Sequence, residues 1–167
     1  PDNTVVEYLS NKYGSHNGYW VVEGYDWYQT MGDTNDFSYG CRGDIDWTIE
    51  TPNSNIPVVW GLHREAMFDI IKGADMGLRG IVTDAQAGQP LAATIWVQEA
   101  YWPCFSDPLI GDYHKPLMPG VYHITVQANG YQEQEFVIDV QAGHPTYLNV
   151  TLSRANTYFA YQITVAR

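Results

Sequence analysis

Five histidines and two cysteines are the side chains of this sequence that could bind a transition metal. A catalytic zinc site takes three protein ligands and leaves one position open for water. None of the histidines is followed by a glutamate three residues later, and they lie in unrelated segments, at His16, His63, His114, His123 and His144. Cys41 and Cys104 are too far apart to be a metal-binding pair, so they are two free thiols or one disulfide. We therefore expect no catalytic metal to be held by this chain alone.

A different chemistry is offered by Glu50, which ends a segment where Ile45, Trp47 and Ile49 alternate with polar residues. Alternation with a period of two predicts a β-strand with one apolar face. A carboxylate at the end of a strand can be rigidly held, which acid–base chemistry requires of a reacting group. The pattern alone fits an ordinary solvated glutamate better.

A long loop precedes this strand. Residues 18–39 are rich in glycine and aromatic residues without a clear period, which predicts a loop with one short helix near residues 35–39. Loops of this length commonly serve a binding or catalytic site. Tyr28 lies within the loop, where packing is the commoner use of tyrosine.

The composition limits the partners. The 167 residues carry a formal net charge of -11, which disfavours binding to nucleic acid or to an anionic membrane surface. No apolar run approaches the roughly 20 residues that span a bilayer. With 45% hydrophobic residues and 14% aromatic residues, the chain is expected to fold as one ordinary domain or two small ones.

Two helices flank the loop and the strand. Residues 5–9 have the apolar spacing of a short amphipathic helix, with Asn3 and Thr4 before it and Gly14 after it. The apolar pattern of residues 56–72 predicts the clearest helix, and Gly73 is expected to end it. Its cap candidates are Asn53, Ser54 and Asn55. Its apolar positions are Val59, Leu62, Ala66, Ile70 and Ile71.

After Gly77 the pattern changes to short apolar runs separated by turn signals. The runs are centred on residues 78–82, 93–97, 121–126, 136–140 and 148–152. Ala87-Gly88, Pro119-Gly120, Asn129-Gly130 and Ala142-Gly143 lie between them. This spacing predicts a small antiparallel sandwich and a boundary near Gly77. Residues 158–165 alternate weakly and could add a strand.

The second half resembles the transthyretin-like, or carboxypeptidase regulatory-like, sandwich over roughly 75 residues. The residues that carry the resemblance are Gly80-Ile81-Val82-Thr83-Asp84, Gly88-Gln89-Pro90, Ala93-Thr94-Ile95-Trp96-Val97, Gly111-Asp112-Tyr113, Leu117-Met118-Pro119-Gly120-Val121-Tyr122 and Gly130-Tyr131.

The first half resembles the C-terminal end of the catalytic domain of zinc metallocarboxypeptidases, of the regulatory or N/E-type branch. The stretches that carry this resemblance are residues 24–29, residues 32–39 and Trp47-Thr48-Ile49-Glu50. The separation of Tyr28 and Glu50 matches that between the family's mobile capping tyrosine and its catalytic glutamate. A catalytic module followed directly by this sandwich is also the family's order.

The resemblance implies a role for each matching residue. Glu50 would be the general base that takes a proton from a zinc-bound water and later gives it to the leaving amine. Tyr28 would close over the terminal residue of the substrate. Asn35 falls at the floor of the pocket for the departing side chain, and Thr48 falls in its wall. An uncharged floor disfavours direct pairing with a basic side chain, although this branch can take an acidic specificity residue from an earlier segment. Asp36 is expected to cap a turn.

Two departures from the family pattern have consequences. The family usually has paired glycines where this chain has Gly32-Asp33, which changes the loop that carries Tyr28. The family binds zinc with two histidines and one glutamate, and it binds the substrate carboxylate with arginines. All of these residues precede the capping tyrosine, and none has a match here. The resemblance thus implies zinc bound by an upstream catalytic-domain segment, peptide or protein C-termini as substrate, and no activity in this chain alone.

The fold that follows is an α/β portion, the C-terminal part of a mixed-sheet carboxypeptidase domain, followed by an all-β antiparallel sandwich. We assign residues 1–76 to the catalytic portion, 77–153 to the sandwich and 154–167 to a C-terminal extension. A piece of a mostly parallel sheet needs both faces covered, so residues 1–76 are expected to be unstable without the upstream part.

The leading hypothesis is therefore an extracytoplasmic zinc carboxypeptidase, whether secreted, periplasmic or at the cell surface. A catalytically inactive relative or a protein-binding or structural module is the alternative. A carbohydrate-binding sandwich is a further one, because Trp96, Tyr101 and Trp102 lie close together in the sequence and sugars stack on exposed aromatic rings.

Overall fold

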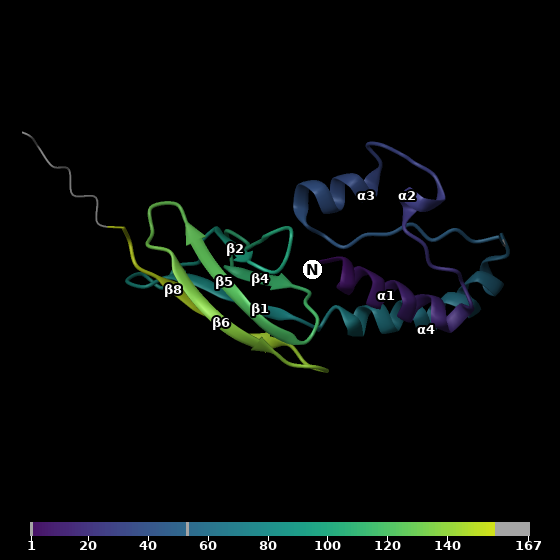
Figure 1. Ribbon diagram of the computed structural model, residues 1–167. Coiled ribbons are helices and arrows are strands. Elements are labelled where there is room, and N and C mark those ends of the chain that lie inside the picture. The colour runs from purple at the N-terminus through teal and green to yellow at the C-terminus, as the bar shows by residue number, and fades with distance from the viewer. Residues whose placement is uncertain (1, 53, 156–167) are drawn as a thin grey trace, which may run out of the picture.

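A computed structural model describes residues 2–52 and 54–155, which form a helical unit and a β-sandwich beside it (Figure 1). The helical unit contains α1 (Asp2–Asn17), α2 (Gly24–Trp27), α3 (Thr34–Phe37), the π-helix η1 (Ser38–Arg42) and α4 (Ile56–Gly73). The sandwich contains β1 (Leu78–Asp84), β2 (Ala93–Val97), β3 (Cys104–Phe105), β4 (Asp112–Lys115), β5 (Gly120–Ala128), β6 (Gln134–Val140), β7 (Thr146–Tyr147) and β8 (Val150–Leu152). Helices followed by a sandwich confirm the predicted order. The weakly alternating residues 158–165 and the cap candidate Asn53 lie outside the described residues.

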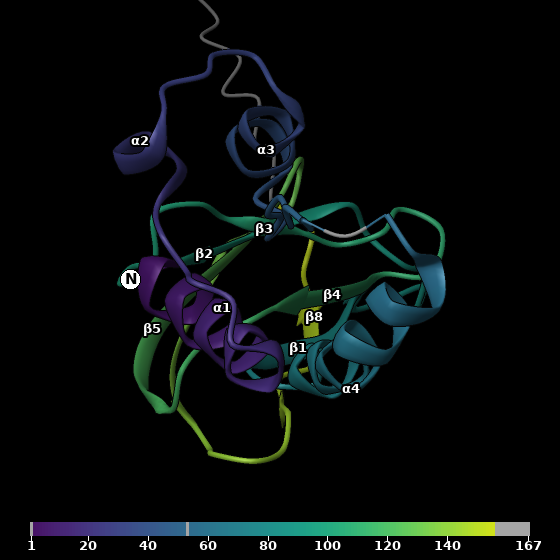
Figure 2. The same ribbon diagram turned by 90° about the vertical axis from the view of Figure 1, so that its right-hand side faces the viewer.

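Helices α1 and α4 pack side by side next to the sandwich, and the end of α4 leads into β1 (Figures 1 and 2). Val5, Leu9 and Tyr13 are the buried side chains of α1, and their spacing of four places them on one stripe of the helix. Leu9 lies against Gly73, where an added Cβ would come 2.8 Å from Leu9 Cδ2. The stripe is thus buried against α4.

Helix α1 is longer than predicted. It passes through Gly14 and ends at Asn17. Gly14 is buried where the returning chain crosses the helix, since an added Cβ would lie 2.7 Å from the carbonyl oxygen of Tyr19. The stop is Gly18, whose φ of 71° is one that glycine adopts without steric cost.

The apolar face predicted for α4 is partly wrong. Ala66 is fully buried, but Leu62 and Ile71 are exposed and His63 is 2% exposed. The buried stripe is therefore turned toward the side that α1 covers. The physical reason is that α1 is the neighbour of this helix in the described chain, so the apolar side chains on its other side remain in solvent.

The strand predicted at Ile45–Glu50 is wrong. Residues 43–52 form no strand, although the helix expected near residues 35–39 is confirmed by α3 and η1. A strand is stabilised by hydrogen bonds to a neighbouring strand, and every strand among residues 78–155 pairs within the sandwich. Alternation alone could not supply a partner, so the helical unit has no sheet within the described residues.

The five apolar runs after Gly77 are confirmed as strands, the last of them as β8, and β3, β4 and β7 were not predicted. One sheet has the order β3-β2-β5-β6 and is antiparallel throughout. The other contains β4-β1-β7, with β8 also pairing with β1. The prediction of an all-antiparallel sandwich is wrong here, because β7 and β8 both run parallel to β1. The β6–β7 connection, residues 141–145, carries the chain across to the other sheet, where β7 runs in the same direction as β1.

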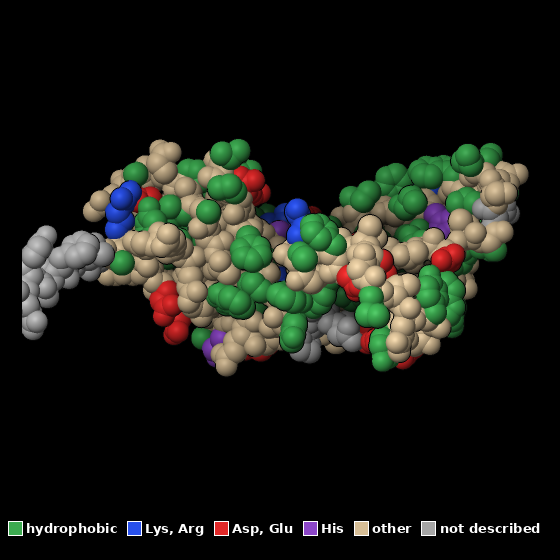
Figure 3. All heavy atoms as spheres, turned by 90° about the horizontal axis from the view of Figure 1, so that it is seen from above, with side chains coloured by type: hydrophobic (Ala, Val, Ile, Leu, Met, Phe, Trp, Pro, Cys, Tyr) green, Lys and Arg blue, Asp and Glu red, His purple; other side chains and the backbone are tan. Residues whose placement is uncertain are grey.

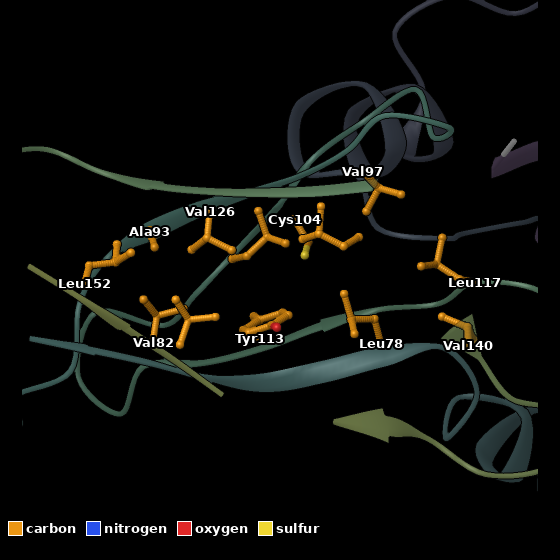
Figure 4. Packing of buried hydrophobic residues seen from close by; sticks show 13 residues of the cluster. Leu78, Val82, Ala93, Val97, Cys104, Tyr113, Leu117, Val126, Val140 and Leu152 are labelled. Carbon is orange, nitrogen blue, oxygen red and sulfur yellow. The ribbon is translucent and has the colours of Figure 1, made fainter. Parts of the chain in front are cut away.

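The core lies between the two sheets (Figure 4). Alternate residues of each strand point inward, such as Leu78, Val82, Ile95 and Val126, all of them fully buried. Figure 4 shows Val97 and Val126 from one layer facing Leu78 and Tyr113 from the other. This single contiguous cluster is the main source of the sandwich's stability.

Gly80 explains one motif of the sandwich. The carbonyl of Leu148, between β7 and β8, passes so close that an added Cβ would lie 1.9 Å from its oxygen. Glycine is required here by close approach of two backbones. Gly80 thus lies between the part of β1 that pairs with β7 and the part that pairs with β8.

Candidate functional site

The loop that carries the predicted site residues is closed by two aspartates. The side chain of Asp33 caps α3 by accepting hydrogen bonds from the Asp36 amide (3.0 Å) and from Thr30 Oγ1 (2.6 Å). Asp36 in turn accepts from the Gly32 amide at 2.6 Å. The Thr30 bond, followed by the Asp36 amide, lowers the pKa of Asp33. Asp33, which replaces the second glycine of the family pattern, therefore starts the helix, and Asp36 fastens the preceding turn.

Asn35 and Thr48 are brought together. Thr48 Oγ1 donates to Asn35 Oδ1 at 3.0 Å, joining α3 to the extended segment 43–52. Two residues earlier, Asp46 accepts from Ser38 Oγ at 3.1 Å. Because the side-chain oxygen Oδ1 of Asn35 accepts this bond, the side-chain NH2 group of Asn35 remains as a donor. The two residues predicted to form the pocket floor and wall are thus neighbours.

Tyr28 lies just after α2 and is 53% exposed. Its backbone amide donates to the carbonyl oxygen of Gly24 at 3.0 Å, and its ring meets Trp27 edge-on with centroids 4.6 Å apart. Trp27 also lies edge-on to Trp20, at 6.4 Å. The tyrosine therefore follows a short helix that has no buried residues, and more than half of its surface is exposed.

Glu50 is exposed at the end of the extended segment. Within residues 2–52 and 54–155 its carboxylate has no hydrogen-bond or ion-pair partner. Among these residues the carboxylate makes no hydrogen bond to Tyr28, Asn35 or Thr48. The carboxylate is therefore accessible, and its position is set by the backbone on each side.

A buried histidine was missed by the sequence reasoning. His63 Nδ1 lies 2.8 Å from Tyr13 Oη and 3.2 Å from Asn17 Nδ2, while Nε2 lies 3.2 Å from Tyr19 Oη. Burial is the main cause that raises the pKa of Tyr13. One feature of the sequence could have indicated that His63 is buried. It lies three residues before Ala66 and so falls on the same buried stripe of α4.

A cavity of about 550 Å³ lies between the helical unit and the sandwich. Both cysteines line it, together with Trp47 and His114, whose pKa is lowered chiefly by burial. Cys41 and Cys104 are free thiols, so of the two alternatives left open by the sequence the structure has the unbonded one. None of the four predicted site residues is in the lining, so the cavity does not coincide with the predicted site.

The aromatic residues that suggested sugar binding do not form one platform. Trp102 lies edge-on to Tyr39 of η1, with centroids 6.4 Å apart, and therefore belongs to the junction of the two units. Tyr101 meets Trp102 at 5.5 Å, and Trp96 stands on the outer face of β2.

No group of three or more His, Cys, Asp or Glu side chains in the described ranges could hold a metal ion. Over the same ranges, no helix has the length and apolarity needed to cross a membrane.

Comparison with known proteins adds two findings. Residues 77–153 match the family model described as the carboxypeptidase regulatory-like domain. The chain is also similar to several curated carboxypeptidases. Human carboxypeptidase D is 31% identical over 88% of this chain, and mouse carboxypeptidase M is 30% identical over 78%. The catalytic chain of rat carboxypeptidase N is 25% identical over 94%.

These relatives are much longer. The match covers 11% of carboxypeptidase D, 31% of carboxypeptidase M and 38% of the carboxypeptidase N catalytic chain. Residues 77–167 are little more than half of this chain, so a match over 88% of it must extend into the helical unit. The similarity thus includes the part that carries Tyr28 and Glu50.

Proposed function

We propose that this chain, a relative of carboxypeptidases D, M and N, is the C-terminal part of an extracytoplasmic, zinc-dependent carboxypeptidase. The enzyme removes the C-terminal residue of peptides or proteins. Residues 1–76 belong to its catalytic domain and residues 77–153 form the accessory sandwich. The observation that carries the proposal is that the similarity to carboxypeptidases extends beyond the regulatory-like sandwich into the helical unit.

Glu50 is the general base of the proposed reaction. It accepts a proton from the attacking water and passes that proton to the leaving amine. Its exposed carboxylate, which has no described partner, supports this role because no bond has to be broken before the carboxylate can act. The bond between Thr48 and Asn35, and that between Ser38 and Asp46, hold the segment that carries it.

Tyr28 and the Asn35–Thr48 pair contact the substrate. Tyr28 caps the terminal residue, which its exposed side chain and the short helix before it allow. Asn35 and Thr48 form an uncharged, polar floor and wall for the departing side chain. Since Asn35 Oδ1 already accepts from Thr48, its Nδ2 is available to donate to a substrate side chain.

The described residues do not fit a zinc ion, because no cluster of three suitable ligands is present among them. We assign the zinc ligands to an upstream catalytic-domain segment outside this chain. That segment is also proposed to pack on the helical unit, where hydrophobic side chains gather on the surface (Figure 3). The large exposed ones include Trp20, Tyr25, Met31, Ile56, Trp60 and Ile71. A surface of this kind marks an interface with another protein segment.

The test is made on the complete protein that contains this chain, as one polypeptide or as two assembled pieces. We expect about one zinc per molecule by elemental analysis, together with release of the last residue from test peptides. Glu50→Gln should lower kcat about a thousandfold, because general acid–base catalysis contributes about 10² to 10⁴.

Glu65→Gln is the matched control, because Glu65 is an exposed glutamate of α4 paired with Arg64. It should leave kcat unchanged. A complete protein that binds no zinc and cleaves no peptide would overturn the proposal and favour a binding or structural module. An active protein whose Glu50→Gln variant retains full activity would remove Glu50 from the mechanism.

A further inference from the structure

We infer that His63 is a positioning residue that fixes the segment carrying Glu50 through Tyr19 and Thr51, which deepens the proposed function and rests on it. His63 is 2% exposed, so it cannot itself contact a substrate. Its effect has to pass through the side chains that it touches.

The tautomer of His63 follows from Asn17. The backbone amide of Tyr19 donates to Asn17 Oδ1 at 3.0 Å, which identifies the other side-chain atom of Asn17 as the NH2 group. That group lies 3.2 Å from His63 Nδ1 and can only donate. Nδ1 is therefore unprotonated, and the Asn17 amide shares its single lone pair with the Tyr13 hydroxyl, which lies nearer at 2.8 Å. In the neutral ring the proton is on Nε2.

The direction of the remaining bonds is then determined. Nε2–H donates to the Tyr19 hydroxyl oxygen at 3.2 Å, and the Tyr19 hydroxyl donates to Thr51 Oγ1 at 3.3 Å. The rings of Tyr19 and His63 also meet edge-on, with centroids 4.9 Å apart. A continuous chain of two hydrogen bonds thus runs from the buried face of α4 to Thr51, the residue that follows Glu50.

This anchor matters because the segment has no strand partner. Residues 43–52 lie outside every β-ladder of the described chain. Backbone bonds from Gly43 and Asp44 to η1 hold the start of the segment, and side-chain bonds hold the part near Glu50. The Thr48–Asn35 bond lies before Glu50, and the Thr51–Tyr19 bond lies after it. A general base has to be held to a fraction of an ångström, so loss of either bond should affect turnover.

The first test uses the complete protein that contains this chain and needs no activity. Nuclear magnetic resonance of the imidazole nitrogens should show His63 with Nε2 protonated and Nδ1 unprotonated. A nuclear Overhauser contact should join the Thr51 methyl group to the Tyr19 ring. His63→Gln, which keeps a donor and an acceptor, should retain the contact, and His63→Leu should lose it. His144→Gln, on an exposed turn, is the control.

The second test uses the complete enzyme. Tyr19→Phe removes one hydroxyl of a half-buried ring and should fold normally, while lowering kcat about tenfold with KM nearly unchanged. His63→Gln should restore most of the kcat lost in His63→Leu. Tyr147→Phe, at an exposed tyrosine of β7, should behave as wild type.

The outcomes separate the two proposals. A wild-type enzyme without carboxypeptidase activity contradicts the proposed function, whereas the resonance measurements still report on the anchor. An Nδ1-protonated His63, or the absence of the contact between Thr51 and Tyr19, overturns the inference about positioning. So does an active enzyme in which Tyr19→Phe and His63→Leu keep wild-type kcat.

Discussion

Asp84 is a buried carboxylate at the end of β1, 3% exposed, and its bonds join two sequence motifs of the sandwich. Its Oδ1 accepts from the amides of Gln86 (2.7 Å) and Ala87 (2.8 Å), and its Oδ2 accepts from the Tyr131 hydroxyl (2.7 Å). The Arg154 guanidinium adds a further bond at 3.3 Å. These bonds, led by that from the Ala87 amide, hold the pKa of Asp84 well below its usual range.

The sign of the resulting pH dependence follows. The folded state prefers the ionised carboxylate, so Asp84 stabilises the fold above its unfolded pKa of about 3.9, and this stabilisation is lost as the pH falls below that value. Asp84→Asn should lower the thermal midpoint at pH 7 and weaken the loss of stability in acid, as measured by circular dichroism. Asp139→Asn, an exposed position of β6, is the control. An unchanged midpoint for Asp84→Asn would contradict the assigned role.

At the residue scale, the sequence indicated which residues to examine but not their bonds. Asn35 and Thr48 were expected in one pocket, and they share a hydrogen bond. Asp33 looked like a departure from a glycine pattern, yet it caps α3, because helix caps depend on a few backbone angles that a motif does not encode. His63 was missed because a histidine on a buried stripe is recognised only when its partners, 44 to 50 residues away in the sequence, are known.

At the scale of elements, Gly80 provides a sharp prediction. Gly80→Ala would place its Cβ against the backbone of Leu148, which cannot move without disturbing both β7 and β8. We expect a loss of about 3 kcal/mol in unfolding free energy, measured by urea denaturation. Gly61→Ala is the matched control, because nothing lies within 4 Å of its added Cβ and it is inside α4. That variant should gain about 1 kcal/mol from helix propensity. Equal effects of the two variants would contradict this account.

The elements that could be predicted were those with a local signal. The apolar runs of β1, β2, β5 and β6 alternate and are bounded by turn residues, so they were recognised. The strand β3 has two residues and β4 reads Asp-Tyr-His-Lys, so neither contains an apolar run. The parallel pairing of β7 and β8 with β1 was also missed, since strand direction depends on the route of the chain and not on composition.

At the scale of the whole molecule, the two units differ in how they are stabilised. The sandwich contains a contiguous cluster of 13 buried hydrophobic residues, all between Leu78 and Leu152. In the helical unit the buried hydrophobic residues of the described chain are Val5, Leu9, Tyr13 and Ala66. The same unit exposes many large apolar side chains, as Figure 3 shows. Its small core leaves little free energy to offset the conformational entropy of about 76 residues.

This imbalance gives a prediction for the separated parts. A fragment of residues 77–155 should unfold in one cooperative transition, because the cluster between its sheets is complete without the helices. A fragment of residues 1–76 should show no such transition in a thermal scan and should bind a dye specific for exposed apolar surface. Adding the upstream catalytic segment should restore cooperativity to that fragment and reduce the dye signal, because its exposed rings would then be covered. A cooperative transition of residues 1–76 alone would show that α1 and α4 suffice to stabilise the unit, and that its apolar surface needs no partner.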